Sequence, residues 1–198
     1  MTEPDGNIKP SDEGREFRDS TYARQFVTGK SVAADPWAGI VEEHGSADVD
    51  ALVAALPDAV IRAGADSSGD PVVQADPAQV TAILTHLRDE AGYTMLTDLT
   101  AADYPEEDDR FWVVYIMTRV KDGLTVRVKA GLPEENPEIE SVVPLFAAAN
   151  WLEREVWDMY GVRFANHPNL ERILMPEDYG AHPMRKEYPV TGDIVMRD

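Results

Sequence analysis

Residues 111–130 read FWVVYIMTRVKDGLTVRVKA, and this stretch decides the fold. Apolar residues occupy both faces of its first half, residues 111–119, so we expect a central strand that is covered on both sides. Its second half, residues 124–130, alternates between apolar and polar residues, which is typical of a strand with one buried and one wet face. A Lys-Asp-Gly turn at residues 121–123 separates the two halves. The stretch therefore predicts a β-hairpin in the interior of a sheet.

Three helices and three further strands are expected around the hairpin. The helices carry apolar residues at intervals of three and four, and the strands are short apolar segments bounded by turn residues. The expected helices begin near Ser46, near Asp76 and at Leu145, and they end at Pro57, before Gly92 and at Tyr160. The expected strands are residues 59–63, 71–75 and 93–99.

The chain is expected to form one domain with an extension at each end. Residues 1–45 mix proline, glycine, serine and charges with few apolar residues, which is typical of a flexible arm, here an acidic one. Residues 46–161 hold the periodic elements and form the α+β domain. Residues 162–198 show no helical or strand period, and prolines alternate there with aromatic, aliphatic and arginine residues. We expect this last region to be an extended tail that binds a partner, because it has no core of its own.

Composition excludes several classes of function. The sequence has no cysteine, so it has no disulfide, no nucleophilic thiol and no thiolate-held iron–sulfur or zinc site. It also lacks the Gly-x-Gly-x-x-Gly motif of dinucleotide sites. The formal net charge of −19 disfavours nucleic acid as a partner, since phosphate contacts need clustered Lys and Arg. The apolar runs fall far short of the ~20 residues of a membrane span, and the polar N-terminus is no secretory signal, so we expect a cytosolic protein.

The helix expected at residues 145–160 has more large apolar residues than one core-facing stripe can hold. Phe146, Trp151 and Trp157 fall outside the stripe. Such a helix is either buried on several sides in its own domain, which is the commoner use of aromatic residues, or meets a partner.

The same helix carries the charged residues Glu153, Arg154, Glu155 and Asp158. Arg154 and Asp158 are four residues apart and can pair. A solvated, salt-bridged face explains such charges most simply. Against this, Asp158 stands where the helix dipole disfavours an acid, and the carboxylates lie among aromatic residues. A general acid–base pair, as in glycosidases, is a further alternative, but no substrate-lining cluster accompanies it in the sequence.

His167 and His182 are the candidates for a metal site, since imidazoles beside carboxylates bind metals. Two distant histidines in irregular chain, without cysteine, are better explained as hydrogen-bonded side chains. We therefore expect no metal site, and no catalytic or cofactor-binding residues.

A dense, ordered set of motifs occupies the last quarter of the chain. These motifs are Glu153-Arg154-Glu155, Trp157-Asp158-Met159-Tyr160-Gly161-Val162, Phe164, His167-Pro168, Leu170, Arg172-Ile173-Leu174, Pro176, Asp178-Tyr179 and Pro183-Met184-Arg185-Lys186-Glu187-Tyr188-Pro189. Together with residues 99–105, 110–111, 114–115 and 127–129, they resemble the C subunit of NADH-quinone oxidoreductase, the respiratory complex I. The resemblance runs from about Ser46 to the end, and the acidic arm departs from the family core.

The resemblance implies an α+β fold, a two-layer domain with a mostly antiparallel sheet and helices on it, followed by the long extended C-terminal tail. It implies a cofactor-free structural subunit in the peripheral arm of a proton-pumping enzyme, supporting electron transfer from NADH to quinone. Iron–sulfur clusters, FMN and quinone would be bound by partner subunits. The implied partners are other peripheral-arm subunits, especially the quinone-site B and D subunits and the ferredoxin-like I subunit. The implied location is the cytoplasmic face of the cell membrane.

The resemblance and the residue types together predict a subunit interface, in which Glu153, Arg154 and Glu155 form a buried network between subunits. Two alternatives stay open: a homologous subunit of a membrane-bound hydrogenase or of an F420H2- or ferredoxin-linked dehydrogenase, and an unrelated hydrolase that uses Glu153 and Glu155. The expected interface residues are Glu153, Arg154, Glu155, Trp157, Asp158, Phe164, His167, Arg172, Tyr179, Arg185, Lys186 and Tyr188.

Overall fold

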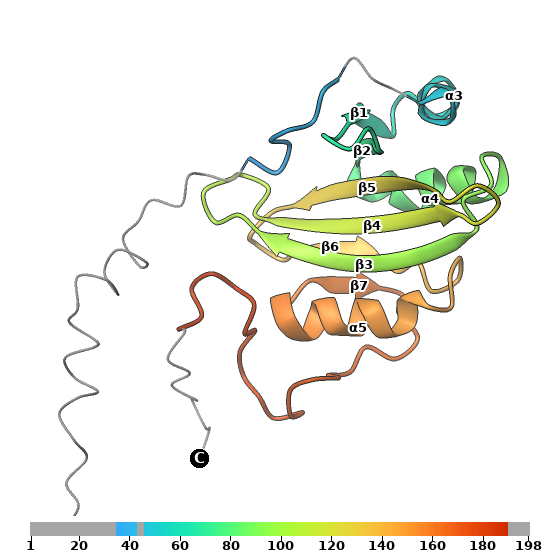
Figure 1. Cartoon of the computed structure of the whole chain (residues 1–198). Coiled ribbons are helices and arrows are strands. Elements are labelled where there is room, and N and C mark those ends of the chain that lie inside the picture. Colours follow the sequence, from blue (N-terminus) through green and yellow to red (C-terminus); the bar gives the residue numbers. More distant parts are fainter. Residues whose placement is uncertain (1–34, 43–45, 190–198) are drawn as a thin grey trace, which may run out of the picture. The chain divides into compact units, whose positions relative to one another are not determined.

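A five-stranded mixed sheet forms the centre of the domain in the computed structural model, which describes residues 35–42 and 46–189 (Figure 1). The strands lie in the order β1-β2-β5-β4-β3, and only the β2–β5 pair is parallel. The predicted α+β class with a mostly antiparallel sheet is confirmed. In chain order the strands are β1 (Val60–Ala65), β2 (Pro71–Ala75), β3 (Met95–Asp103), β4 (Phe111–Arg119) and β5 (Leu124–Leu132).

The hairpin predicted from residues 111–130 is present as β4 and β5. The two strands pair antiparallel over their full length, and Gly123 supplies a positive φ of 75° in the turn between them. Four core-facing residues of β4 are buried, namely Phe111, Val113, Tyr115 and Met117. On the opposite face Trp112 is only 4% exposed, but Val114 and Ile116 are half-buried, so this face is covered less completely than expected. β4 lies between β5 and β3, so its predicted interior position is confirmed.

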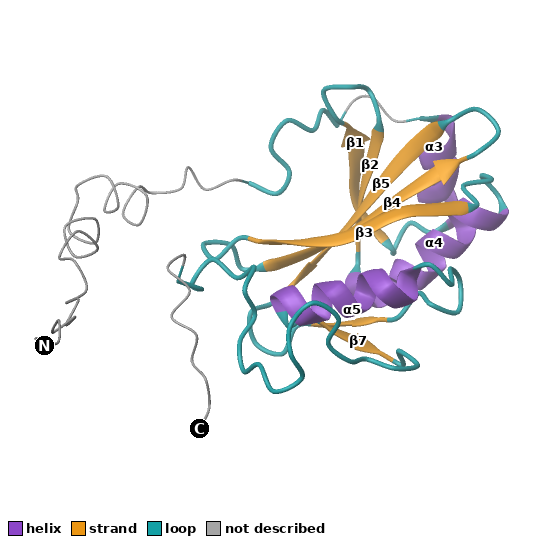
Figure 2. Ribbon diagram, turned by 60° about the horizontal axis from the view of Figure 1, so that its bottom comes forward, coloured by secondary structure: helices purple, strands orange, loops and turns teal. Residues whose placement is uncertain are grey.

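Three helices complete the domain: α3 (Ala47–Ala55), α4 (Val80–Asp89) and α5 (Ala149–Tyr160), with the short 3-10 helix η1 (Pro77–Gln79) before α4. Figure 2 shows α4 and α5 on one face of the sheet. Apolar residues of all three helices share a single core with that face. This arrangement gives the two predicted layers. In the described ranges, no helix is both long and apolar enough to cross a bilayer.

The other face of the sheet is partly covered by residues 35–42. Trp37 is buried, and the guanidinium of Arg62 lies 4.4 Å from its ring centroid. Lys129 of β5 donates from Nζ to the carbonyl of Pro36 at 2.7 Å. The sequence places residues 35–42 in the flexible arm, whereas the structure bonds them to the sheet. The rest of the predicted arm, residues 1–34 and 43–45, lies outside the described residues.

The chain after α5 returns to the core. Gly161 ends the helix in the left-handed conformation, and β7 (Arg163–Ala165) then pairs in parallel with β6 (Glu138–Glu140). Phe164 of β7 and Ile139 of β6 are both buried. The predicted boundary between domain and tail after residue 161 therefore has no counterpart here, because the core includes residues on both sides of it.

Candidate interface site

The expected interface residues on α5 differ widely in exposure. Glu153 and Asp158 are completely buried, Arg154 and Trp157 are half-buried, and Glu155 is exposed. The two buried acids need hydrogen-bond partners, because burying an unsatisfied carboxylate is strongly unfavourable.

Glu153 is held by the loop that precedes α5. Its Oε2 accepts from the Ser141 hydroxyl at 2.6 Å, and its Oε1 accepts from the backbone N–H of Val142 at 2.7 Å. Burial raises the pKa of Glu153 to about 7, although these two hydrogen bonds favour the charged form. The side chain therefore changes its protonation state near neutral pH.

Two further titratable groups surround Glu153. His167 Nε2 lies 3.9 Å from Glu153 Oε2, and both side chains are fully buried. His167 Nδ1 accepts from the N–H of Asn169 at 3.1 Å, so its proton is on Nε2, 3.2 Å from the Asn150 carbonyl. Burial lowers the pKa of His167, which makes the ring neutral. Burial and the charge of Glu153 raise the pKa of Tyr115, whose hydroxyl has no hydrogen-bond partner among the described residues.

Asp158 binds the segment that follows β7. Its Oδ2 accepts from three consecutive backbone N–H groups, those of Ile173, Leu174 and Met175, at 2.8–3.1 Å. Its Oδ1 accepts from Arg172 Nη1. Burial alone would raise the pKa of Asp158, but these donors together lower it. The carboxylate is therefore a charged group fixed inside its own chain.

Arg154 makes no ion pair with Asp158, although their spacing of four residues allows one. Its guanidinium donates to the backbone carbonyls of Glu171 and Arg172, both at 3.0 Å, and lies 4.9 Å from the ring centroid of Trp151. Asp158 takes its countercharge from Arg172 instead. Arg154 and Asp158 thus bind the same segment of their own chain from two sides.

The same segment covers the C-terminal end of α5, where the last four backbone carbonyls have no partner inside the helix. All four accept hydrogen bonds from residues 161–185. Two donors are guanidinium groups, whose positive charge suits the negative end of the helix dipole. The pairs are Trp157 with Gly161 N–H at 2.8 Å, Asp158 with Arg172 Nη1 at 3.3 Å and His182 Nδ1 at 3.0 Å, Met159 with Met184 N–H at 3.0 Å, and Tyr160 with Arg185 Nε at 2.6 Å.

A second charged cluster, which the sequence did not predict, holds the end of the described chain. Arg110 binds Asp103 through two hydrogen bonds of 2.8 and 3.0 Å, and both side chains are almost fully buried. Asp103 Oδ2 also accepts from the backbone N–H of Lys186 at 2.7 Å, and Arg110 reaches Glu187 and Glu134. Hydrogen bonding to Asp103 is the main cause that raises the pKa of Arg110. No periodicity or spacing predicts this pair, since its members flank an irregular loop between β3 and β4.

The remaining expected interface residues also contact their own chain, and the expected network between subunits stays a prediction. Phe164 lies in the core, the hydroxyls of Tyr179 and Tyr188 bond to each other, and the Arg185 guanidinium lies 4.9 Å from the Phe111 ring centroid. Trp157 lies 5.6 Å beneath the guanidinium of Arg172, while Lys186 is exposed. The segment at residues 170–188 is irregular as predicted, but its polar groups are bound to α5 and Asp103.

Three large apolar side chains stay exposed around α5, and we call them the docking face. Trp151 is 59% exposed, Leu174 61% and Met184 52%. All three lie on α5 or on the segment bonded to it. The sequence placed Trp151 outside the core stripe of the helix, which the structure confirms, but none of the three is among the expected interface residues. The sequence did not predict the contacts that residues 170–188 make with their own domain, so it could not show which side chains of this segment stay exposed.

The geometry gives the metal and hydrolase alternatives no support. In the part of the chain that the structure describes, no three His, Asp or Glu side chains gather closely enough to hold a metal ion. Glu153 lies in the core while Glu155 is exposed, so these carboxylates do not share a cleft. An acid–base pair would have to flank one substrate.

Fold and site together define a class: an α+β domain of one mixed sheet, with helices on one face and a C-terminal segment bonded to the last helix. The chain belongs to the family described as respiratory-chain NADH dehydrogenase, 30 Kd subunit, whose model matches residues 73–194. The resemblance to the C subunit of NADH-quinone oxidoreductase is thereby confirmed.

Similar chains in several bacteria are named as this C subunit. The NADH-quinone oxidoreductase C subunit of Citrifermentans bemidjiense is 44% identical over 124 residues, covering 63% of this chain and 77% of the relative. That of Paramagnetospirillum magneticum is 39% identical over 148 residues, 74% of each chain. That of Moorella thermoacetica is 44% identical over 133 residues, 67% of this chain and 87% of the relative.

Two solved structures share the fold. The trypsin-resistant fragment (1-134) of Nqo5 has a TM-score of 0.55 and 27% identity, and the match covers 62% of this chain and 99% of the fragment. A chain of the membrane-bound sulfane sulfur reductase, an archaeal respiratory membrane complex, has a TM-score of 0.62 and 22% identity, covering 73% and 85%. At this identity the second likeness concerns the fold alone.

Proposed function

We propose that this chain is a cofactor-free structural subunit in the peripheral arm of a proton-pumping NADH-quinone oxidoreductase. It supports electron transfer from NADH to quinone by holding together subunits that bind the iron–sulfur clusters, FMN and quinone. Membership of the family supports the complex, and the absence of cysteine from the sequence removes the usual cluster ligands from this chain. The docking face is the observation that carries the structural role.

The docking face has the physical properties of a contact surface. A large apolar side chain contributes about 1.5–3 kcal/mol when fully buried, and tryptophan is among the residues that most often dominate interfaces. Asp158 and Arg154 already fix the segment that carries Leu174, so docking does not have to order it. Binding energy is then not spent on immobilising the chain.

The partners proposed for this face are other peripheral-arm subunits, especially the quinone-site B and D subunits and the ferredoxin-like I subunit. The complex would place this chain at the cytoplasmic face of the cell membrane. The names of relatives at 39–44% identity support NADH-quinone oxidoreductase over a hydrogenase or an F420H2- or ferredoxin-linked dehydrogenase.

The test is to replace Trp151, Leu174 and Met184 together by alanine in the full chain. Because these side chains are exposed, the isolated variant should keep its melting temperature to within a few degrees. Its incorporation into the detergent-solubilised complex should fall at least about tenfold, which corresponds to roughly 1.4 kcal/mol. Native electrophoresis of solubilised membranes measures incorporation, and NADH:quinone activity follows it.

The matched control replaces Ile61, Val120 and Leu124 by alanine. These residues are 58%, 65% and 48% exposed and lie on β1 and at the turn of the β4–β5 hairpin. The control should assemble normally. Normal assembly of the first variant would refute the docking face. Copurification of the wild-type chain with hydrogenase or F420H2-dehydrogenase subunits would refute the assigned complex.

A further inference from the structure

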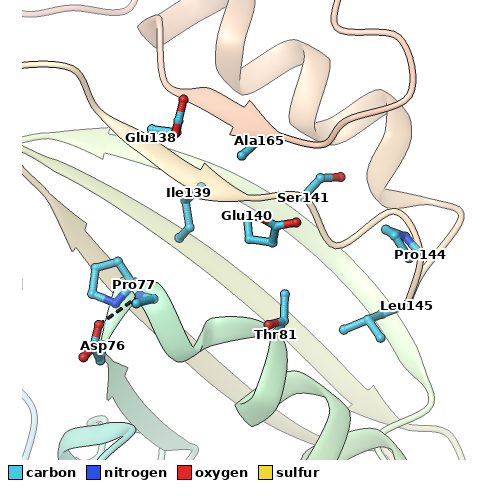
Figure 3. A pocket seen from close by; sticks show the side chains of 11 residues that line it. Asp76, Pro77, Thr81, Glu138, Ile139, Glu140, Ser141, Pro144, Leu145 and Ala165 are labelled. Carbon is cyan, nitrogen blue, oxygen red and sulfur yellow. Dashed lines mark hydrogen bonds between the residues drawn. The ribbon is translucent and has the colours of Figure 1, made fainter.

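A hollow of about 810 Å³ lies beside β6. Figure 3 shows β6 along one side of it, with η1 and the start of α4 opposite. Pro144 and Leu145, in the loop before α5, and Ala165 at the end of β7 also line it. The volume lies within the range of roughly 300–1,000 Å³ in which proteins bind ligands.

The edge of β6 that faces the hollow is open. On its other edge β6 pairs with β7, as the bonds from Arg163 N–H to the Pro137 carbonyl and from Ser141 N–H to the Ala165 carbonyl show. Backbone groups of successive strand residues point to opposite edges, so those of residues 138 and 140 point away from β7. Among the described residues, nothing bonds to the main-chain N–H or C=O of either one. An open strand edge is a template for another strand.

The charge of the hollow is negative. Asp76, Glu138 and Glu140 line it, and no lysine or arginine is among its lining residues. Arg163 pairs with Glu138 at 3.3 Å, whereas Glu140 accepts from the uncharged amide of Asn166 at 2.8 Å. Asp76 accepts from a backbone N–H of η1, which leaves its charge in place. The hollow therefore favours a positively charged occupant.

We propose that the open edge of β6 receives an extended segment of a partner polypeptide by strand addition, with Lys or Arg side chains of that segment facing Asp76 and Glu140. Main-chain hydrogen bonds to residues 138 and 140 would provide affinity, and the carboxylates would provide selectivity. Two copies of this chain, each with a net charge of −19, would repel each other, so charge favours a different polypeptide. The proposal does not rest on the proposed function, since no docking-face residue lines the hollow.

The probes are fluorescein-labelled, overlapping peptides of about ten residues, which together cover the sequences of the proteins that copurify with the full chain. Fluorescence anisotropy measures their binding to the full chain. We expect one or a few basic peptides, called tiles below, to bind. Glu140→Pro removes the N–H that faces the hollow but spares the β6–β7 bonds, and Pro is tolerated on strand edges. It should weaken binding at least about tenfold. Glu140→Lys, which keeps the N–H, should weaken it similarly by charge.

Glu135→Lys is the matched control, because Glu135 is exposed, lies on the preceding loop and does not line the hollow. It should bind the tile as wild type does, and so should the alanine variant of the docking face. Binding that survives both Glu140 substitutions would overturn the proposal, as would the failure of every tile. Two further results would overturn the proposal, because they would show that the edge of β6 binds this chain itself. One is binding of a peptide of residues 190–198. The other is self-association in sedimentation that Glu140→Lys abolishes.

Discussion

Glu153 is a buried acid whose charge has no arginine or lysine partner among the described residues. Its carboxyl oxygens are satisfied by Ser141 and Val142, and the nearest ring nitrogen belongs to a neutral histidine, His167. Burial without a countercharge favours the protonated form. The folded chain therefore holds a proton on Glu153 over a pH range in which the unfolded chain has released it.

We expect Glu153→Gln to change the pH dependence of unfolding. The folded-state pKa of about 7 lies above the ordinary 4.5, so wild-type stability from this group falls as the pH rises from about 4.5 to about 7. Glutamine mimics the protonated acid, because it can accept from Val142 N–H and donate to Ser141 Oγ. The variant should match wild type near pH 4.5 and exceed it at pH 8 by up to about 3 kcal/mol. Urea unfolding at pH 5 and pH 8 measures the difference.

His167 is present in wild type and in the Glu153→Gln variant, so its own burial contributes to both, and only its interaction with the nearby Glu153 carboxyl differs between them. Burial lowers the pKa of His167, so its own contribution has the opposite slope and stabilises the fold as the pH rises. Glu155→Gln, on the exposed side of the same helix, is the matched control and should have the same small effect at both pH values. A Glu153→Gln effect that does not differ between pH 5 and pH 8 would show that Glu153 is already ionised in the fold.

Among the elements, α5 is distinguished by a C-terminal end that its own chain covers. Each hydrogen bond to these carbonyls contributes about 0.5–1.5 kcal/mol net, and leaving a buried carbonyl unpaired costs more. Gly161 makes the arrangement possible in two ways. Its φ is 78°, and a Cβ at this position would lie 2.5 Å from Arg185 Nη2 and 2.7 Å from the His182 ring.

Gly161→Ala should therefore loosen the C-terminal segment from α5. Gly123→Ala is the matched control, since Gly123 has a similar φ of 75° but no atom within 4 Å of an added Cβ. The control should lower the free energy of unfolding by about 1–2 kcal/mol, because alanine is strained in the left-handed conformation. Gly161→Ala should cost more and should speed tryptic cleavage after Arg185 and Lys186. If both variants lost the same free energy of unfolding and were cleaved at the same rate, the structure would relieve the close contact at Gly161 without loss of stability.

The elements that the sequence predicted are those whose signal is local. The β4–β5 hairpin follows from alternation within 20 residues, and Ser46 caps α3 as its side chain suggests. Asp76 caps the 3-10 helix η1, and the α-helix itself begins only at Val80. β6 and β7 were not predicted, because each has three residues and its partner lies about 25 residues away. The last helix begins at Ala149, not Leu145, because turns at residues 142–149 first bring Phe146 into the core.

For the molecule as a whole, the sequence indicated the residue types of the site but not their contacts. Prolines and missing periodicity correctly predicted irregular chain after β7. They could not show that the carbonyls of α5, with Asp103 and Asp158, would bind it, because those contacts join residues up to 83 positions apart. An extended segment needs a surface, and here the described residues find one in their own domain.

Removal of residues 163–198 should consequently unfold the domain, contrary to what an independent tail predicts. The deletion takes β7 from β6, exposes Ile139, and removes the donors that satisfy the Asp158 carboxylate, which is completely buried. The deletion also removes Phe164 from the core, and loss of a large core side chain costs about 3–5 kcal/mol, a large share of the about 5–15 kcal/mol that stabilises a domain.

The matched control ends the chain at residue 189, which keeps all described contacts of the segment. Far-UV circular dichroism during heating distinguishes the outcomes. The control should melt cooperatively near the full chain, and the chain ending at residue 162 should show no cooperative transition. If the shorter chain melted cooperatively within a few degrees of the control, the contacts of Asp158, Arg172 and β7 would be dispensable. The segment would then be a separable tail whose stability depends on a partner.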